Sequence, residues 1–243
     1  MWKIKQIFDG DYGCEETCSE TGQAKEPMVS VTLVEENIGE NGKEPIKYVT
    51  VPDRFLTEHG LEEGSDWRLT DQKPPKEYAF WGWENANVLA VSNDYPGIRT
   101  PWDLYDALSE IWCSETCAPR MRDGWTKENK TLGQCSITAF LAQDIFGGKV
   151  YGILRAGGNY HCYNVIGDCA FDLTSEQFGS EKLDYTGNPE QIREVHFAKE
   201  EKRLRYEYLK TELKKILENM YIQKKNLSKL KLMINCGMRL NIS

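Results

Sequence analysis

The chain has 243 residues, of which 40% are hydrophobic and 28% are charged, and its formal net charge at pH 7 is −8. These values are ordinary for a globular protein and allow one or two domains with a sizeable core, so they exclude a disordered or collagen-like chain. No apolar run reaches the ~18 residues of a membrane-spanning helix. The acidic balance argues against non-specific binding of nucleic acid. We therefore expect neither a membrane nor a nucleic-acid partner.

The cysteines raise the question of disulfides or a metal. The N-terminal sequence lacks the apolar stretch of a secretory signal, so we expect a cytoplasmic protein without a disulfide framework. Eight cysteines are a high number for a cytoplasmic protein. Four of them form two Cys-x-x-x-Cys pairs: Cys14 with Cys18, and Cys113 with Cys117. Four thiolates could hold a tetrahedral zinc ion. Structural zinc pairs usually lie on tight turns, however, and the second pair lies in or just after a predicted helix. We therefore expect no metal and no cofactor.

Residues 1–67 predict a small β-rich module. Apolar and polar residues alternate from Val29 to Val34, as in a strand. The turn signal Asn41-Gly42 then leads to a partner strand from Ile46 to Val51. Pro52 opens a short helix.

Residues 68–99 predict a linker or packing segment, because prolines stand near both of its ends. Four aromatic residues gather in its middle: Tyr78, Phe80, Trp81 and Trp83. Such residues commonly pack between two modules. They are also our candidate docking surface for a protein partner, at residues 78–83.

Residues 100–198 predict an α+β domain. Thr100 as N-cap, followed by Pro101, begins one helix. A second helix follows Cys135 and ends at Gly147-Gly148. Three strands come next, with a two-residue Gly167-Asp168 loop between the last two. Their predicted ranges are Lys149–Arg155, Tyr160–Ile166 and Cys169–Asp172.

Residues 199–243 predict a basic helical tail, with twelve Lys and Arg residues against five Glu residues. Apolar side chains recur on one helical face, which favours a packing helix over a coiled-coil partner. They are Leu209, Leu213, Ile216, Leu217 and Met220. The rest of the chain is correspondingly more acidic, and the tail either packs on this body or binds another acidic surface.

Cys135 is the candidate nucleophile. It stands at the start of a predicted helix, where unpaired backbone amides and the helix dipole favour a thiolate. A thiolate is the nucleophile of cysteine hydrolases and acyltransferases, and it needs a base. Of the three histidines, His161 lies on the strand that follows this helix. The amide of Gln134, beside the Cys135 backbone N–H, is our candidate for binding an oxyanion.

The predicted hairpin selects the group that orients His161. A two-residue loop pairs Ile166 with Cys169, and side-chain alternation then places His161 and Asp172 on one face. Asn164 points to the opposite face. Asp172 is therefore the predicted partner of the imidazole.

Several segments of this region resemble the YunG-like family of bacterial proteins. They are residues 133–141, 146–148, 160–164 and 171–178. The resemblance covers roughly Pro101 to Phe197 and implies no particular reaction, because the family has none established.

The order of the candidate residues is also similar to that of the papain and transglutaminase-like superfamily. That resemblance implies that Cys135 is the nucleophile, His161 the base and Asp172 the orienting group. The segment is short for a protease, and it lacks the aromatic-rich nucleophile motif of papain.

We therefore expect an α+β protein with a β-rich N-terminal module, a papain-like or transglutaminase-like domain and a C-terminal helix. In that domain, a helix with an N-terminal cysteine would pack on an antiparallel sheet. The predicted function is that of a thiol hydrolase or acyltransferase acting on an amide or thioester of an unknown small molecule or peptide. The alternative is a non-catalytic binding module on the same scaffold. A cysteine at a helix start is often only a small buried residue, and a strand histidine near an aspartate is often only a satisfied polar pair.

Overall fold

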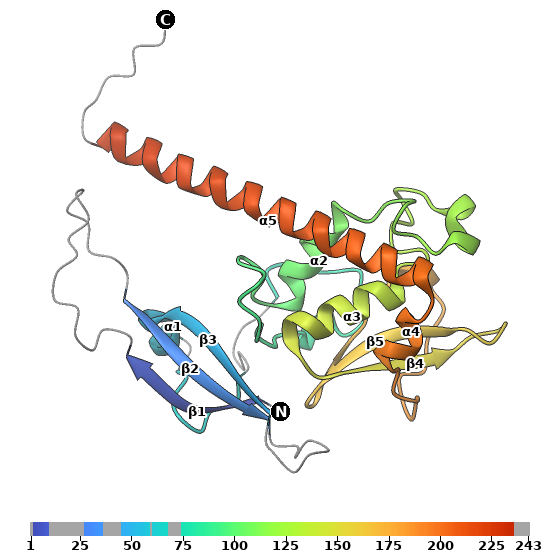
Figure 1. Ribbon diagram of the computed structural model, residues 1–243, viewed down its shortest axis with the longest axis horizontal. Coiled ribbons are helices and arrows are strands. Elements are labelled where there is room, and N and C mark those ends of the chain that lie inside the picture. Colours follow the sequence, from blue (N-terminus) through green and yellow to red (C-terminus); the bar gives the residue numbers. More distant parts are fainter. Residues whose placement is uncertain (1, 10–26, 36–44, 59, 68–73, 236–243) are drawn as a thin grey trace, which may run out of the picture.

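The computed structural model describes residues 2–9, 27–35, 45–58, 60–67 and 74–235. It combines helices with two antiparallel sheets of three strands each (Figure 1). The predicted α+β class is therefore confirmed.

The first sheet has the order β1-β2-β3 and contains β1 (Trp2–Asp9), β2 (Met28–Glu35) and β3 (Ile46–Pro52). The predicted pairing of the second and third strands is confirmed. Strand β1 was not predicted, because a register shift between Ile4 and Gln6 interrupts the regular alternation. The short helix α1 (Asp53–Glu58) follows β3.

The second sheet has the order β4-β5-β6 and contains β4 (Lys149–Leu154), β5 (Tyr160–Ile166) and β6 (Cys169–Phe171). The hairpin register follows the two-residue loop as predicted, with Ile166 opposite Cys169. Strand β6 ends one residue earlier than predicted. Asp172 leaves the hairpin and instead forms an antiparallel bridge with Trp81.

Helix α2 (Pro101–Ser109) begins where the sequence predicts, and its N-terminus is capped by Asp103. The Thr100 backbone N–H donates a 3.0 Å hydrogen bond to Asp103 Oδ2. The helix ends at Ser109, and the apolar residues Ile111 and Trp112 lie beyond its end although both are buried in the same core. Short 3-10 turns occur at Trp83–Asn85, Pro119–Gly124 and Ser175–Phe178.

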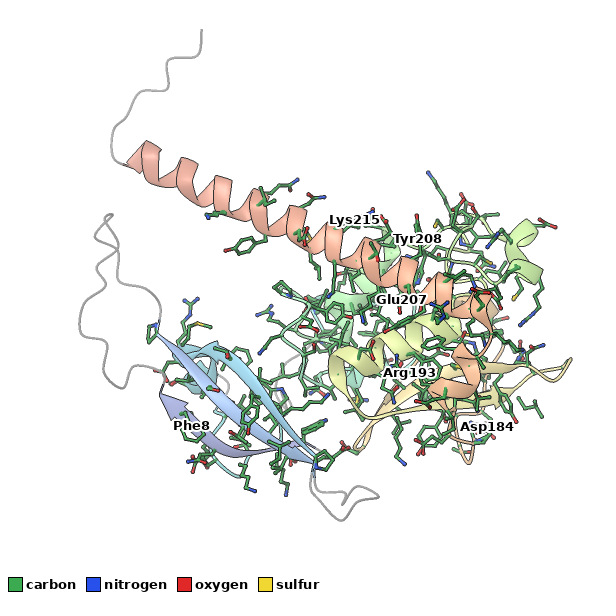
Figure 2. The ribbon with its side chains drawn as sticks, viewed as in Figure 1. Phe8, Asp184, Arg193, Glu207, Tyr208 and Lys215 are labelled. Atoms are coloured by element: carbon green, nitrogen blue, oxygen red, sulfur yellow. The ribbon has the colours of Figure 1, made fainter. Side chains whose placement is uncertain are left out.

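Helix α3 (Cys135–Phe146) packs on β5 and ends at Gly147. Gly147 has a φ of 74°, a backbone conformation that residues other than glycine rarely adopt. Helix α4 (Arg193–Phe197) precedes the long α5 (Glu200–Asn235), which crosses α3 and projects beyond the body (Figure 1). Arg193 of α4, labelled in Figure 2, connects this helix to both α3 and α5. Its guanidinium forms a 2.6 Å ion pair with Asp144 of α3 and donates a 3.4 Å hydrogen bond to the Tyr206 hydroxyl of α5.

One large core lies between the second sheet and the helices. Besides the residues of α2, α3 and the sheet, it contains side chains from two regions that the sequence assigns outside the α+β domain. From residues 78–98 these are Tyr78, Phe80, Ala86, Val88, Tyr95 and Ile98, and from α5 they are Tyr206, Leu209, Leu213 and Leu217. A smaller core under the first sheet includes Leu89 and Val91, so the two cores meet along this segment. Within the described residues, no helix has the length and apolar character needed to span a membrane.

Helix α5 is expected to stabilise the fold through its buried face. Leu213 is fully buried, so Leu213→Ala should lower the free energy of unfolding by about 2–5 kcal/mol. Leu204 lies on the same helix and is 55% exposed, so Leu204→Ala is the matched control with an expected change within about 0.5 kcal/mol. Urea denaturation measures the free energy of unfolding of both variants. Equal losses of stability in Leu213→Ala and Leu204→Ala would show that the buried face of α5 does not stabilise the fold.

Candidate functional site

Cys135 is the first residue of α3 and is half-buried. It lines a cavity of about 720 Å³ together with His161. Gly133, two residues earlier, has a φ of 70°, and a Cβ atom there would lie 2.8 Å from the sulfur of Cys117. Only glycine fits this turn without strain, and the turn aims the start of α3 at the cavity.

His161 and Asp172 form a buried pair beside Cys135. His161 Nε2 lies 2.6 Å from Asp172 Oδ2, and the two side chains are 2% and 1% exposed. The imidazole also shares a hydrogen bond with the Cys135 side chain. Since Asp172 occupies Nε2, the other ring nitrogen, Nδ1, is left for the sulfur. The structure thus brings together three of the four predicted site residues.

Asp172 is fixed by further donors. The backbone N–H and the hydroxyl of Thr174 donate to Oδ1 over 3.0 and 3.1 Å. The Tyr185 hydroxyl donates to Oδ2 over 2.9 Å. With His161, these donors engage both carboxylate oxygens, which lets a charged group stay buried and holds the imidazole in one orientation.

The site favours a thiolate facing an imidazolium. Burial lowers the pKa of His161, but the charge of Asp172 and hydrogen bonds to Asp172 and Cys135 outweigh it and raise that pKa to about 10. The pKa of Cys135 is lowered well below that of an ordinary thiol. The largest cause is a hydrogen bond with Cys162, and His161 acts in the same direction against the effect of burial. Both shifts favour the charged forms, a thiolate on Cys135 and an imidazolium on His161.

Cys162 is a second thiol at the site that sequence reasoning did not assign. It lies on β5 next to His161 and is 1% exposed. Its pKa is raised well above the usual value, chiefly by the hydrogen bond with Cys135 and also by burial. Cys162 therefore stays protonated and donates to the Cys135 thiolate.

Gln134 does not take the predicted place. Its side chain is fully buried, and Nε2 donates a 3.1 Å hydrogen bond to the carbonyl oxygen of Cys113. In this conformation the amide holds the preceding loop and does not face the cavity. The first backbone N–H groups of α3 remain as donors for an oxyanion, because helix geometry gives them no partner within the helix.

Comparison with known proteins finds one family that resembles the region of this site. The model of the YunG protein family matches residues 100–218. Over 54 residues the chain is 44% identical to the uncharacterized protein YunG of Bacillus subtilis (strain 168). Residues 100–218 are YunG-like. The alignment covers 22% of this chain and 46% of the relative, so the chain spans less than half the length of the curated protein it matches. No solved structure matches the chain.

The aromatic segment 78–83 supports the YunG-like region from outside its boundary. Tyr78 and Phe80 are buried in the large core, whereas Trp81 is 41% exposed. Trp81 stacks on Tyr185 with a ring separation of 3.6 Å, and its carbonyl accepts a 3.0 Å hydrogen bond from the Asp172 backbone N–H. Trp81 therefore holds both Asp172 and Tyr185 in position. No local sequence signal predicts this role.

Arg205, from α5, was also missed and clamps the loop before Cys135. Its guanidinium is 7% exposed, with Nη1 donating to the carbonyl oxygens of Thr116 and Gly133 over 2.9 and 3.4 Å. Glu201 balances its charge at 3.0 Å. A predicted basic tail thus supplies a structural part of the YunG-like site.

The suggested four-cysteine metal site cannot be assembled from described residues, since Cys14 and Cys18 lie outside them. Cys113 and Cys117 are free thiols. Within the described part of the chain, no group of three or more His, Cys, Asp or Glu residues is arranged to hold a metal ion.

Alkylation of Cys135 by iodoacetamide should reveal the lowered thiol pKa. Lowering the pH through that pKa protonates the thiolate and stops the reaction, so the midpoint should lie well below the ~8.5 of a free cysteine. His161→Ala should move the midpoint up, because it removes the imidazolium. Peptide mass spectrometry across a pH series measures the rate at Cys135, and identical midpoints in both proteins would contradict the pairing.

Asp172 and Tyr185 should affect the same midpoint unequally. Asp172→Asn removes the negative charge that keeps His161 protonated, so the Cys135 midpoint should rise clearly. Tyr185→Phe leaves the carboxylate three other donors and should raise it less. A shift in Tyr185→Phe equal to that in Asp172→Asn would assign the effect to packing around Tyr185 instead of to charge.

Proposed function

We propose that the YunG-like region is a thiol hydrolase or acyltransferase acting on an amide or thioester carbonyl. The observation that carries this proposal is the chain of contacts from Cys135 through His161 to Asp172, beside a cavity of about 720 Å³. The proposed roles are nucleophile for Cys135, base and acid for His161, and orienting group for Asp172. These roles and their order along the chain resemble those of papain-like and transglutaminase-like proteins.

In the first half-reaction, the Cys135 thiolate attacks the carbonyl carbon and a C–S bond forms. The π electron pair moves to the carbonyl oxygen, where the first backbone N–H groups of α3 stabilise the negative charge. As this pair returns, the C–N or C–S bond to the leaving group breaks. The His161 imidazolium gives its proton to the leaving amine or thiolate, and an acyl thioester remains on Cys135.

In the second half-reaction, neutral His161 takes a proton from water or from an acceptor amine or alcohol. The oxygen or nitrogen of this acceptor attacks the thioester carbon, and the C–S bond breaks with its electron pair on sulfur. The thiolate and imidazolium are thereby restored. Water gives hydrolysis, and another acceptor gives acyl transfer.

The position of Cys162 is consistent with this chemistry. A protonated neighbour stabilises the thiolate without adding a second nucleophile, and Cys162 is too buried to compete for substrate. Phe178 packs edge-on against the His161 ring at 4.6 Å and limits its exposure to water. Both contacts favour a pre-organised ion pair.

Acyl transfer to the enzyme can be detected with a small neutral thioester, N-acetylcysteamine S-acetate. We expect acetylation of Cys135 under conditions in which other thiols react little, and loss of this reaction in His161→Ala. Quenched-reaction peptide mass spectrometry locates the acetyl group.

Two cysteine variants serve as controls. Cys135→Ala should abolish the reaction, whereas Cys113→Ala, at a thiol that is also half-buried, should leave it unchanged. Acetylation spread evenly over Cys135 and Cys113, or none at Cys135, would count against the enzyme and favour a non-catalytic binding module on the same scaffold.

A further inference from the structure

The charged side chains that line the cavity beside Cys135 are mostly positive. Five cations face it, and one carboxylate, Glu201, opposes them. The cations are Arg120, Arg155, Lys199, Lys202 and Arg205. A cluster of positive charge is unexpected on a protein with a net charge of −8. These cations must therefore either be neutralised by acidic side chains of the protein or be available to bind an anionic ligand.

Two of the five cations have structural partners. Arg155 pairs with Glu181 at 2.8 Å and lies over the ring of Phe178. Arg205 pairs with Glu201 at 3.0 Å. Their charges are balanced, so neither needs a ligand.

The other three cations have no carboxylate within ion-pair distance among the residues that the structure describes. Arg120 donates only to the neutral Asn159 side chain, over 3.3 Å. Lys202 Nζ donates to the ring of His196 over 3.0 Å. Lys199 is exposed at the rim. They come from separate segments, one before α3 and two around the start of α5, and they converge on one cavity.

Lys202 and its neighbours form an ordered array. His196 accepts from Lys202 through Nδ1, and its Nε2 lies 3.0 Å from Gln191 Oε1, to which it donates. Burial lowers the pKa of His196 to about 4, so the ring is neutral and adds no charge. Burial also lowers the pKa of Lys202, while negative charge on the neighbouring pair of Cys162 and Cys135 acts to raise it. A half-buried ammonium in this position gains from an additional anion.

We propose that this pocket selects substrates that carry a compact anionic group, which binds between Arg120, Lys199 and Lys202 while the carbonyl faces Cys135. The inference rests on the proposed function, because it names the substrate class of the same site. The anionic group is a carboxylate or a phosphate, since both fit arginine and lysine donors. A neutral substrate would leave these charges uncompensated.

The test compares two alkylating agents of similar size, anionic iodoacetate and neutral iodoacetamide, on the whole 243-residue chain. The rate ratio at Cys135 is divided by the same ratio for free N-acetylcysteine. We expect a normalised ratio clearly above one that falls as salt is added, because salt screens exposed charges. A ratio of one or less would overturn the proposal.

The charge variants decide which groups are responsible. Arg120→Gln combined with Lys199→Gln removes two exposed cations and should lower the ratio at least roughly fivefold, the effect of about one unit charge at close range. Lys202→Gln should lower it further. Lys149→Gln is the matched control, since Lys149 forms an ion pair with Glu190 and lies outside the cavity. In the sheet Lys149 is opposite Val165, at the other end of β5 from His161. The positive charge of His161 is present in all these variants and favours iodoacetate in each of them. An unchanged rate ratio in the double variant would therefore overturn the assignment of anion binding to Arg120 and Lys199.

The two levels of inference fail differently. If neither agent reacts selectively at Cys135, the proposed function fails and the substrate class fails with it. If both agents react selectively but without preference for iodoacetate, only the anionic substrate class is wrong. Once the preference is established, protection of Cys135 by succinate or by inorganic phosphate distinguishes a carboxylate from a phosphate.

Discussion

The buried carboxylate of Asp172 is the group on which the candidate site depends. A charged side chain at 1% exposure is strongly unfavourable unless its oxygens are engaged. Its donors come from β5, from the turn after β6 and from the loop that carries Tyr185, and Trp81 holds both its backbone and the Tyr185 ring. All these segments must be in place before the charge can be buried. Folding of this region and assembly of the Cys135–His161–Asp172 contacts are therefore coupled.

Helix α5 imposes the second constraint, from the opposite side. Its buried leucines complete the core over α3, while Arg205 holds the carbonyl oxygens of Thr116 and Gly133. The loop before Cys135 is thus fixed from α5 by Arg205 and from within by Gln134. The proposed role of Cys135 as a nucleophile requires a fixed position at the start of α3, and residues far apart in sequence supply that rigidity.

Local signals predicted the parts of the site that depend on nearby residues. The two-residue loop at Gly167-Asp168 set the hairpin register, and with it the common face of His161 and Asp172. The predicted start of a helix at Cys135 is also confirmed, since α3 begins there. Tyr185, Trp81 and Arg205 were not predicted, because their contacts span long separations and have no periodic pattern. The oxyanion role predicted for Gln134 fails for a related reason: its neighbour in sequence is the candidate nucleophile, but its hydrogen-bond partner, Cys113, lies 21 residues away.

The uneven charge of the chain acquires a physical role at this site. Three of the five cavity cations, Lys199, Lys202 and Arg205, lie at the start of the basic tail, whose later residues run away from the body. Cations around a thiolate have two opposing effects, since they stabilise it and also attract anions that would raise its pKa again. The arrangement separates these effects by depth. His161 and Cys162 stabilise the sulfur directly, while the proposed anion site extends outward from Lys202 to Arg120 and Lys199, which are exposed at the rim.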